Sequence, residues 1–161
     1  MEQKLEDMVL RIAEMCSGRR NFNRTVLCRL CYYSDFDHYE LRGASISGST
    51  YVLRNGGPEP VDIDRVLGSM SLRGLIRLHT HAGDVSIVPL TPGDDVLSEE
   101  EVGSIGSTVE RYGGMNERIL SWKARGDAPC CGKRPSEKID YASVSLRNCT
   151  MSTGGMGEGR A

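Results

Sequence analysis

The stretch GLIRLHTHAGDVSIVPLTPGDD, residues 74–95, decides the prediction of both fold and functional class. It opens with an apolar run that is typical of a buried strand, and the run ends at His79 and His81. Side chains at positions i and i+2 of a strand project from the same face, so we expect the two imidazoles side by side. Two neutral imidazoles can bind one divalent metal ion, for which zinc is the usual choice.

A catalytic zinc site needs a third protein ligand and an open position for water. Asp94 lies thirteen residues after His81, at the expected start of a helix that can fold back over the strand end. The predicted ligands are therefore His79, His81 and Asp94, with water as the fourth. Zinc lowers the pKa of bound water to about 7, which supplies a hydroxide nucleophile. The simpler interpretation is two satisfied polar histidines followed by an ordinary helix cap.

These residues resemble the motif of the JAMM or MPN family of zinc metalloproteases, in which a His-x-His pair is followed by a serine and an aspartate. Here the pair at 79–81 is followed, after nine residues, by TPGD at 91–94. The resemblance implies an α/β fold with a mixed, curved sheet flanked by helices. It also implies zinc (Zn²⁺) on His79, His81 and Asp94, with Thr91 stabilising the oxyanion in place of the family's serine.

The family also carries a glutamate on an early strand, ahead of two glycines. The segment ELRG at 40–43, with Gly48 after it, is similar. The resemblance implies that Glu40 is the general base, and Glu59, in a Gly/Pro-rich turn, is the second candidate. The implied activity is zinc-dependent hydrolysis of an amide or isopeptide bond, with a protein or a ubiquitin-like modifier as substrate. The resemblance covers about residues 1–122.

Other functional classes stay open. Many MPN-like domains act as non-catalytic scaffolds or interaction modules. The segment LHTH at 78–81 is also similar to the opening motif of PHP-type phosphoesterases, and its HTH part to class II aldolases. Both of those classes need later histidines, and none follows His81 in this chain.

The six cysteines allow a further alternative. With no export signal, buried thiols are the default prediction. The CxxC at 28–31 together with Cys130 and Cys131 could instead form a structural zinc module. A redox CxxC is not favoured, because no βαβ pattern surrounds it. The cysteines stand at positions 16, 28, 31, 130, 131 and 149.

Composition limits the function classes. The chain has 161 residues, of which 39% are hydrophobic, enough for the core of one domain. Its 20 basic and 22 acidic residues give a net charge of −2, which argues against bulk electrostatic binding of nucleic acid or anionic membrane. No apolar run is long enough to span a bilayer, and the N-terminus lacks the core of a signal peptide. We therefore expect a cytoplasmic protein, and the oligomeric state stays open.

Periodicity gives a coarse map of the elements. Helices are expected over 2–16, 61–70 and 92–112, the last with competing starts at Thr91 and Ser98. Strands are expected over 39–54, 74–81 and 119–123, while 25–34 fits either a helix or a strand.

We expect two regions along the chain. A JAMM/MPN-like domain spans 1–126, and an irregular, Cys-containing extension spans 127–161. The Gly-rich segment 150–161 has too little apolar content to order itself, so it is expected to be disordered.

Overall fold

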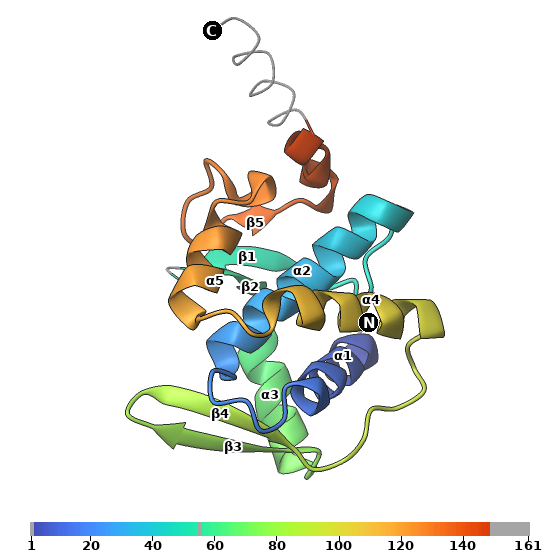
Figure 1. Ribbon diagram of the computed structural model, residues 1–161, viewed down its shortest axis with the longest axis vertical. Helices are drawn as coiled ribbons and strands as arrows, with labels where there is room; N and C mark the ends of the chain where they lie inside the picture. The colour runs from blue at the N-terminus through green and yellow to red at the C-terminus, as the bar shows by residue number, and fades with distance from the viewer. Residues whose placement is uncertain (1, 55, 149–161) are drawn as a thin grey trace, which may run out of the picture.

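The computed structural model describes residues 2–54 and 56–148. They form a mixed α/β fold with helix α2 running through its middle (Figure 1), which confirms the predicted class. In chain order the elements are α1 (Glu2–Met15), α2 (Arg24–Arg42), β1 (Tyr51–Arg54), β2 (Gly57–Pro60), α3 (Ile63–Leu72), β3 (Ile76–His81), β4 (Asp84–Pro89), α4 (Glu99–Tyr112), α5 (Glu117–Arg125), the short 3-10 helix η1 (Ala128–Cys130), β5 (Lys138–Ile139) and the 3-10 helix η2 (Tyr141–Val144).

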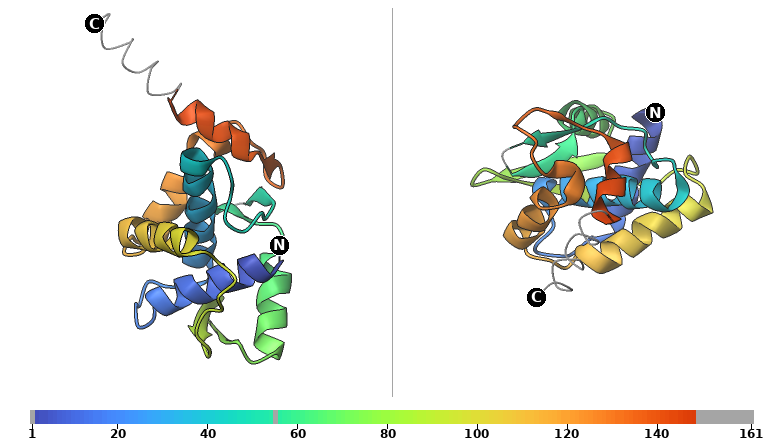
Figure 2. Two further views of the ribbon diagram at one scale, coloured as in Figure 1. Left: turned by 90° about the vertical axis from the view of Figure 1, so that its right-hand side faces the viewer. Right: turned by 90° about the horizontal axis from the view of Figure 1, so that it is seen from above.

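Helix α2 is the centre of the core, and α1, α4 and α5 pack around it (Figures 1 and 2). It begins after Asn23, whose side chain accepts a hydrogen bond from the Val26 N–H at 2.9 Å, and ends at Gly43 with a φ of 75°. The ambiguous run 25–34 is therefore helical, and it is buried on all sides because the helix passes through the core. The strand expected over 39–54 is confirmed only for residues 51–54, since the helix continues to Arg42 and a loop follows it up to residue 50.

The strands form two small sheets rather than the one mixed, curved sheet expected from the family resemblance. Strand β1 pairs antiparallel with both β2 and β5, and β3 pairs antiparallel with β4 in a separate hairpin. Residues 39–42 and 119–123 belong to helices, so the strands that a larger sheet would need are missing from the described residues. The hairpin lies at one end of the molecule and η2 at the other (Figure 1).

Capping residues set the limits of the two helices after the hairpin. The side chain of Ser98 accepts from the Glu101 N–H at 3.1 Å, and the Glu101 carboxylate accepts from the Ser98 N–H at 2.9 Å. This capping box decides between the two predicted starts in favour of Ser98. The strand expected over 119–123 is wrong: α5 begins after Asn116 and buries Leu120 and Ala124, which lie one turn apart.

Residues 127–148 pack on the rest of the fold, so the boundary expected after residue 126 is not a break in packing. Strand β5 pairs with β1, and Ile139 and Val144 are part of the hydrophobic core. The segment 150–161, predicted to be disordered, and Cys149 lie outside the described residues.

Four of the five described cysteines are buried free thiols, as predicted. Burial raises the pKa of Cys28 to about 12 and that of Cys130 to about 11, so these thiols stay protonated at neutral pH. Cys131 is exposed. In the described parts of the chain, no helix combines the length and the apolar character needed to cross a membrane.

A buried arginine fixes the position of α5 relative to the core. The Arg29 guanidinium donates to the carbonyl of Pro58 at 2.9 Å and to the hydroxyl of Ser121 at 3.2 Å, which joins α2, β2 and α5. The backbone of Gly57 passes so close that a Cβ there would lie 2.8 Å from the arginine Nε, and its φ of 142° also favours glycine.

Candidate functional site

The two histidines of the predicted zinc site lie on the β3–β4 hairpin. The strand prediction for them is confirmed, and His79 and His81 share a face, opposite Ser86 and Asp84. The expectation of a buried strand is wrong for this half of β3, because only Ile76 is buried and both histidines are exposed. The pair therefore faces solvent near the tip of a projecting hairpin.

The other residues of the predicted hydrolase site lie elsewhere. Thr91 and Asp94 belong to the loop between β4 and α4, where the Asp94 carbonyl accepts a hydrogen bond from Arg11. Glu40 is on the last turn of α2, at the end of the molecule opposite to the hairpin (Figure 1).

Glu59, the second candidate base, forms ion pairs with three arginines. Its carboxylate lies 3.0 Å from Arg24, 3.7 Å from Arg54 and 3.8 Å from Arg29. These contacts give it a structural role at the start of β2 and α3, away from the histidines.

The donor set for zinc is not assembled. Over residues 2–54 and 56–148, no group of three His, Cys, Asp or Glu side chains is close enough to hold a metal ion. This applies to the two histidines with Asp94, and equally to the cysteines of the alternative zinc module. Zinc stays a prediction from the sequence, and the residues present do not form a site that fits it.

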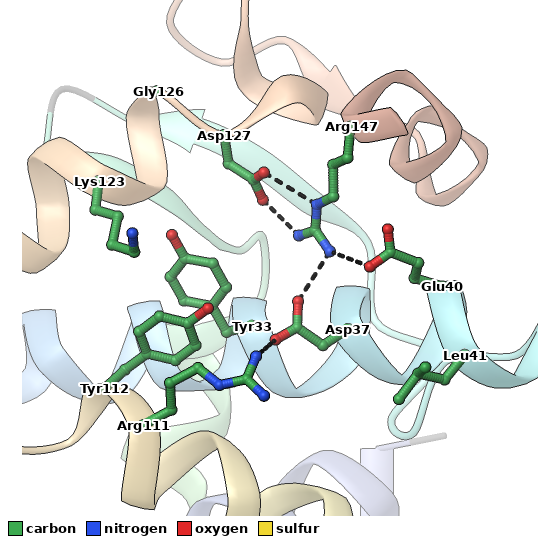
Figure 3. Close-up of a pocket in the computed structure, with 10 residues that line it drawn as sticks. All are labelled: Tyr33, Asp37, Glu40, Leu41, Arg111, Tyr112, Lys123, Gly126, Asp127 and Arg147. Carbon is green, nitrogen blue, oxygen red and sulfur yellow. Dashed lines mark hydrogen bonds and ion pairs between the residues drawn. The ribbon is translucent and has the colours of Figure 1, made fainter. Parts of the chain in front are cut away.

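Glu40 instead lines a cavity of about 490 Å³ between α2, α4, α5 and the C-terminal segment (Figure 3). One wall is an ion-pair network centred on Arg147. Its Nη1 lies 2.9 Å from Asp37 and 3.2 Å from Glu40, and Nε and Nη2 contact both oxygens of Asp127. Burial raises the pKa of the Asp37 carboxyl, and Arg147 partly offsets that effect. Arg147 thus uses its donors on three carboxylates.

The facing wall carries aromatic and basic side chains. The rings of Tyr33 and Tyr112 stack with their centroids 4.1 Å apart, and the guanidinium of Arg111 lies 5.7 Å from the centroid of the Tyr112 ring. Arg111 also lies 3.9 Å from Asp37, a long ion pair. Lys123 extends from α5 toward the two rings (Figure 3), and no carboxylate of the described residues lies within ion-pair distance of it.

The outer face of α5 combines apolar and basic residues. Ile119 and Trp122 lie one turn apart and are 57% and 71% exposed. Arg118, Lys123 and Arg125 flank them and are exposed as well. The inner face of the same helix is buried, so the two apolar side chains are not needed for the core.

Three further hollows surround α5 and share lining residues. A hollow of about 770 Å³ is lined by Ile119, Trp122 and Arg118, and it meets a second hollow, of about 620 Å³, at Arg118 and Ser121. A third, of about 520 Å³, shares Trp122 with the first. The third also shares Lys123 with the cavity of Figure 3, so the concave surface continues around the helix.

The sequence contained signals for α5 that the strand interpretation missed. Asn116 before Glu117 is a typical helix start, and Gly126 after Lys123 and Arg125 is a typical helix end. With the helix recognised, residues 118, 119 and 122 fall on one face. Whether these side chains are exposed, by contrast, depends on what packs against the helix, and the local sequence does not predict it.

Comparison with known proteins gives no relative: no protein-family model, no curated protein and no solved structure matches this chain.

Proposed function

We propose that the protein is a binding module that receives an acidic, amphipathic segment of a partner protein on the outer face of α5. The observation that carries the proposal is the exposure of Ile119 and Trp122 one turn apart on a helix whose opposite face is buried in the core. Burying a side chain of this size is worth about 1.5–3 kcal/mol. Tryptophan is also among the residues that dominate the energy of protein interfaces.

The position of this pair separates it from other exposed apolar residues. Leu72 and Leu41 are also exposed, but neither has a second exposed large apolar residue within one turn of its own helix, and single exposed apolar residues are common on protein surfaces. Ile119 and Trp122 lie together beside a hollow of about 770 Å³, which has room for side chains of a partner.

Charge indicates the chemistry of the partner. No ion pair joins Arg118 or Lys123 to a carboxylate of the described residues. The one acidic residue of α5, Glu117, accepts a hydrogen bond from Asn23. The exposed charged side chains of α5 are therefore all basic, although the whole chain has a net charge of −2. Acidic flanks on a partner segment would complement it.

An amphipathic helix is the form of partner that fits best. Such helices present apolar anchors at spacings of three or four residues, which matches the spacing of Ile119 and Trp122. Single-stranded nucleic acid can also stack on a tryptophan within a basic groove. The two exposed apolar side chains favour a peptide, and nucleic acid is the competing outcome of the test.

The alternative left open by the sequence, a non-catalytic interaction module, agrees with this proposal. We do not propose a zinc-dependent isopeptidase, because the predicted histidine ligands and the predicted base, Glu40, lie on separate elements at opposite ends of the molecule.

The proposal can be tested by fluorescence, because Trp122 is the only tryptophan in the chain. The probe is a helical peptide of leucine and glutamate, titrated into the protein at low ionic strength. Binding over α5 should shift the emission of Trp122 to shorter wavelength, and Ile119→Ser should weaken binding by about tenfold or more.

The matched control is Leu72→Ser, which removes an exposed leucine at the end of another helix, α3, and should leave the affinity unchanged. Equal affinity for a peptide of leucine and lysine would overturn the proposal. If a single-stranded oligonucleotide bound more tightly than the acidic peptide, the partner would be a nucleic acid and the proposal would be overturned. Self-association that buries Trp122 would mean that the surface binds a second copy of the chain, and this too would overturn the proposal.

A further inference from the structure

We propose that the cavity of Figure 3 is a separate binding site for a compact anionic group, a phosphate or a carboxylate, carried by a small molecule. Arg111 and Lys123 are the residues that hold it. This site goes beyond the peptide surface of α5, because Arg111, Asp37 and Tyr33 line only this cavity.

The distribution of ion pairs within the cavity carries the argument. Its lining contains three basic residues and three acidic ones, so its charge is balanced overall. The three carboxylates, however, all contact Arg147 on one wall. The charge is therefore unevenly distributed, and the opposite wall carries two cations that are paired weakly or not at all among the described residues.

Lys123 and Arg111 are these two cations. Lys123 comes from α5 and has no carboxylate of the described residues within ion-pair distance. Arg111 comes from the last turn of α4, and its carboxylate partner, Asp37, is 3.9 Å away. Hydrogen bonds between such cations and an anionic oxygen are about twice as strong as neutral ones, so an oxyanion would be bound well there.

The tyrosines add neutral donors and a rigid floor. Burial raises the pKa of both Tyr33 and Tyr112, so their hydroxyls stay protonated and can donate to an anion. Their stacked rings hold α2 against α4 at this point. The site therefore needs little rearrangement to receive a ligand.

The size of the cavity sets the class of ligand. A volume of about 490 Å³ falls within the range of about 300–1,000 Å³ that is usual for small-molecule sites. A free phosphate ion would fill only a small part of it. The ligand is therefore expected to be a phosphorylated or carboxylated metabolite-sized molecule whose anionic group contacts Lys123 and Arg111.

The test is a titration followed by amide NMR spectra at constant ionic strength. The probes are inorganic phosphate, phosphoserine and acetate, which separate phosphate from carboxylate recognition. The amides of Gly126 and Tyr112, both in the lining, should shift in a saturable manner. Arg111→Gln and Lys123→Gln should each weaken binding by about tenfold or more.

Lys138→Gln is the control, because it removes an exposed lysine on β5, outside the cavity. Circular dichroism establishes that each variant is folded. If Lys123→Gln unfolds the protein, the anion affinity of Arg111→Gln alone tests the proposal. Arg111→Gln should leave binding of the acidic peptide intact. Shifts that rise linearly with each anion, or that persist in Arg111→Gln, would overturn the proposal.

Discussion

Arg147 meets Asp127 with two of its guanidinium nitrogens, the Nε lying 3.0 Å from one carboxylate oxygen and the Nη2 bonded to the other. Tyr32 on α2 donates its hydroxyl to the same carboxylate at 2.7 Å. The last described residues are thereby tied to the central helix and to the end of α5. Their attachment forms one wall of the cavity in Figure 3.

Substitution of this arginine should be costly. Arg147→Ala removes the cation that three partly buried carboxylates share, and we expect the free energy of unfolding to fall by about 2–3 kcal/mol. Urea unfolding measures the change. Arg65→Ala is the control: its ion pair with Glu2 is exposed and screened by solvent, so its loss should be the smaller effect. Equal effects of the two substitutions would contradict a structural role of the network.

A buried carboxylate should be equally important for the loop before β1. Asp35 accepts hydrogen bonds from the backbone N–H groups of Ile46 and Ser47 at 2.8 and 2.7 Å and from the Tyr51 hydroxyl at 2.6 Å. Asp35→Asn turns one acceptor into a donor, so two or more buried donors lose their partner, at a cost of about 3 kcal/mol. Tyr51→Phe removes one bond and should cost about 1–2 kcal/mol.

Thermal unfolding of the two variants, side by side, tests this ranking. A smaller loss in Asp35→Asn than in Tyr51→Phe would mean that the carboxylate is not the centre of the network.

The capping box of α4 gives a prediction about pH. Burial alone raises the pKa of Glu101, but hydrogen bonds from the Ser98 N–H and from Lys4 outweigh it, so the pKa lies below its usual value of 4.5. A lowered pKa in the folded state stabilises the protein above the usual value, and the contribution disappears as the pH falls through the lowered one.

Unfolding free energies of wild type and Glu101→Gln should therefore differ at pH 7 and converge as the pH falls from 4.5 through the lowered pKa. Ser98→Ala should cost about 1 kcal/mol at pH 7 by removing the cap. If the difference in unfolding free energy between wild type and Glu101→Gln grew as the pH fell, the lowered pKa of Glu101 would be contradicted.

The hairpin histidines should contribute little to stability. Both side chains of His79 and His81 are exposed and have no metal-binding partners among the described residues. The double substitution to alanine should change the unfolding free energy by less than about 0.5 kcal/mol. A metal chelator should leave the melting temperature of wild type unchanged. If the chelator lowered the melting temperature of wild type but not that of the double variant, the result would support a zinc site at these histidines.

Local signals predicted those elements whose sequence pattern agrees with their packing. The helix at 2–16 has a clear apolar stripe, and Ser98 with Glu101 is a capping box in sequence and in structure. The runs 39–42 and 119–123 contain aromatic or apolar residues in short stretches, for which helix and strand cannot be separated by periodicity. Their helical state depends on the buried faces that α2 and α5 present to the core.

The site residues were harder to predict than the fold. A His-x-His pair on a strand is a metal signal only if a third ligand comes close, and that depends on how the loop with Asp94 folds. The cavity of Figure 3 joins residues 33–41 to 111–127 and to Arg147. No local motif connects these three segments, so the cavity becomes visible only when they are packed together.

The most direct test of the proposed function is a charge exchange at Arg118. This residue lines the hollow beside Trp122 but not the cavity of Figure 3, so the test concerns the α5 surface alone. The variant Arg118→Glu should bind the acidic peptide about tenfold or more weakly than wild type does, and it should bind the matching lysine peptide more tightly. Trp122 emission reports both affinities. Unchanged affinity for the acidic peptide in Arg118→Glu, with no gain for the lysine peptide, would contradict the account.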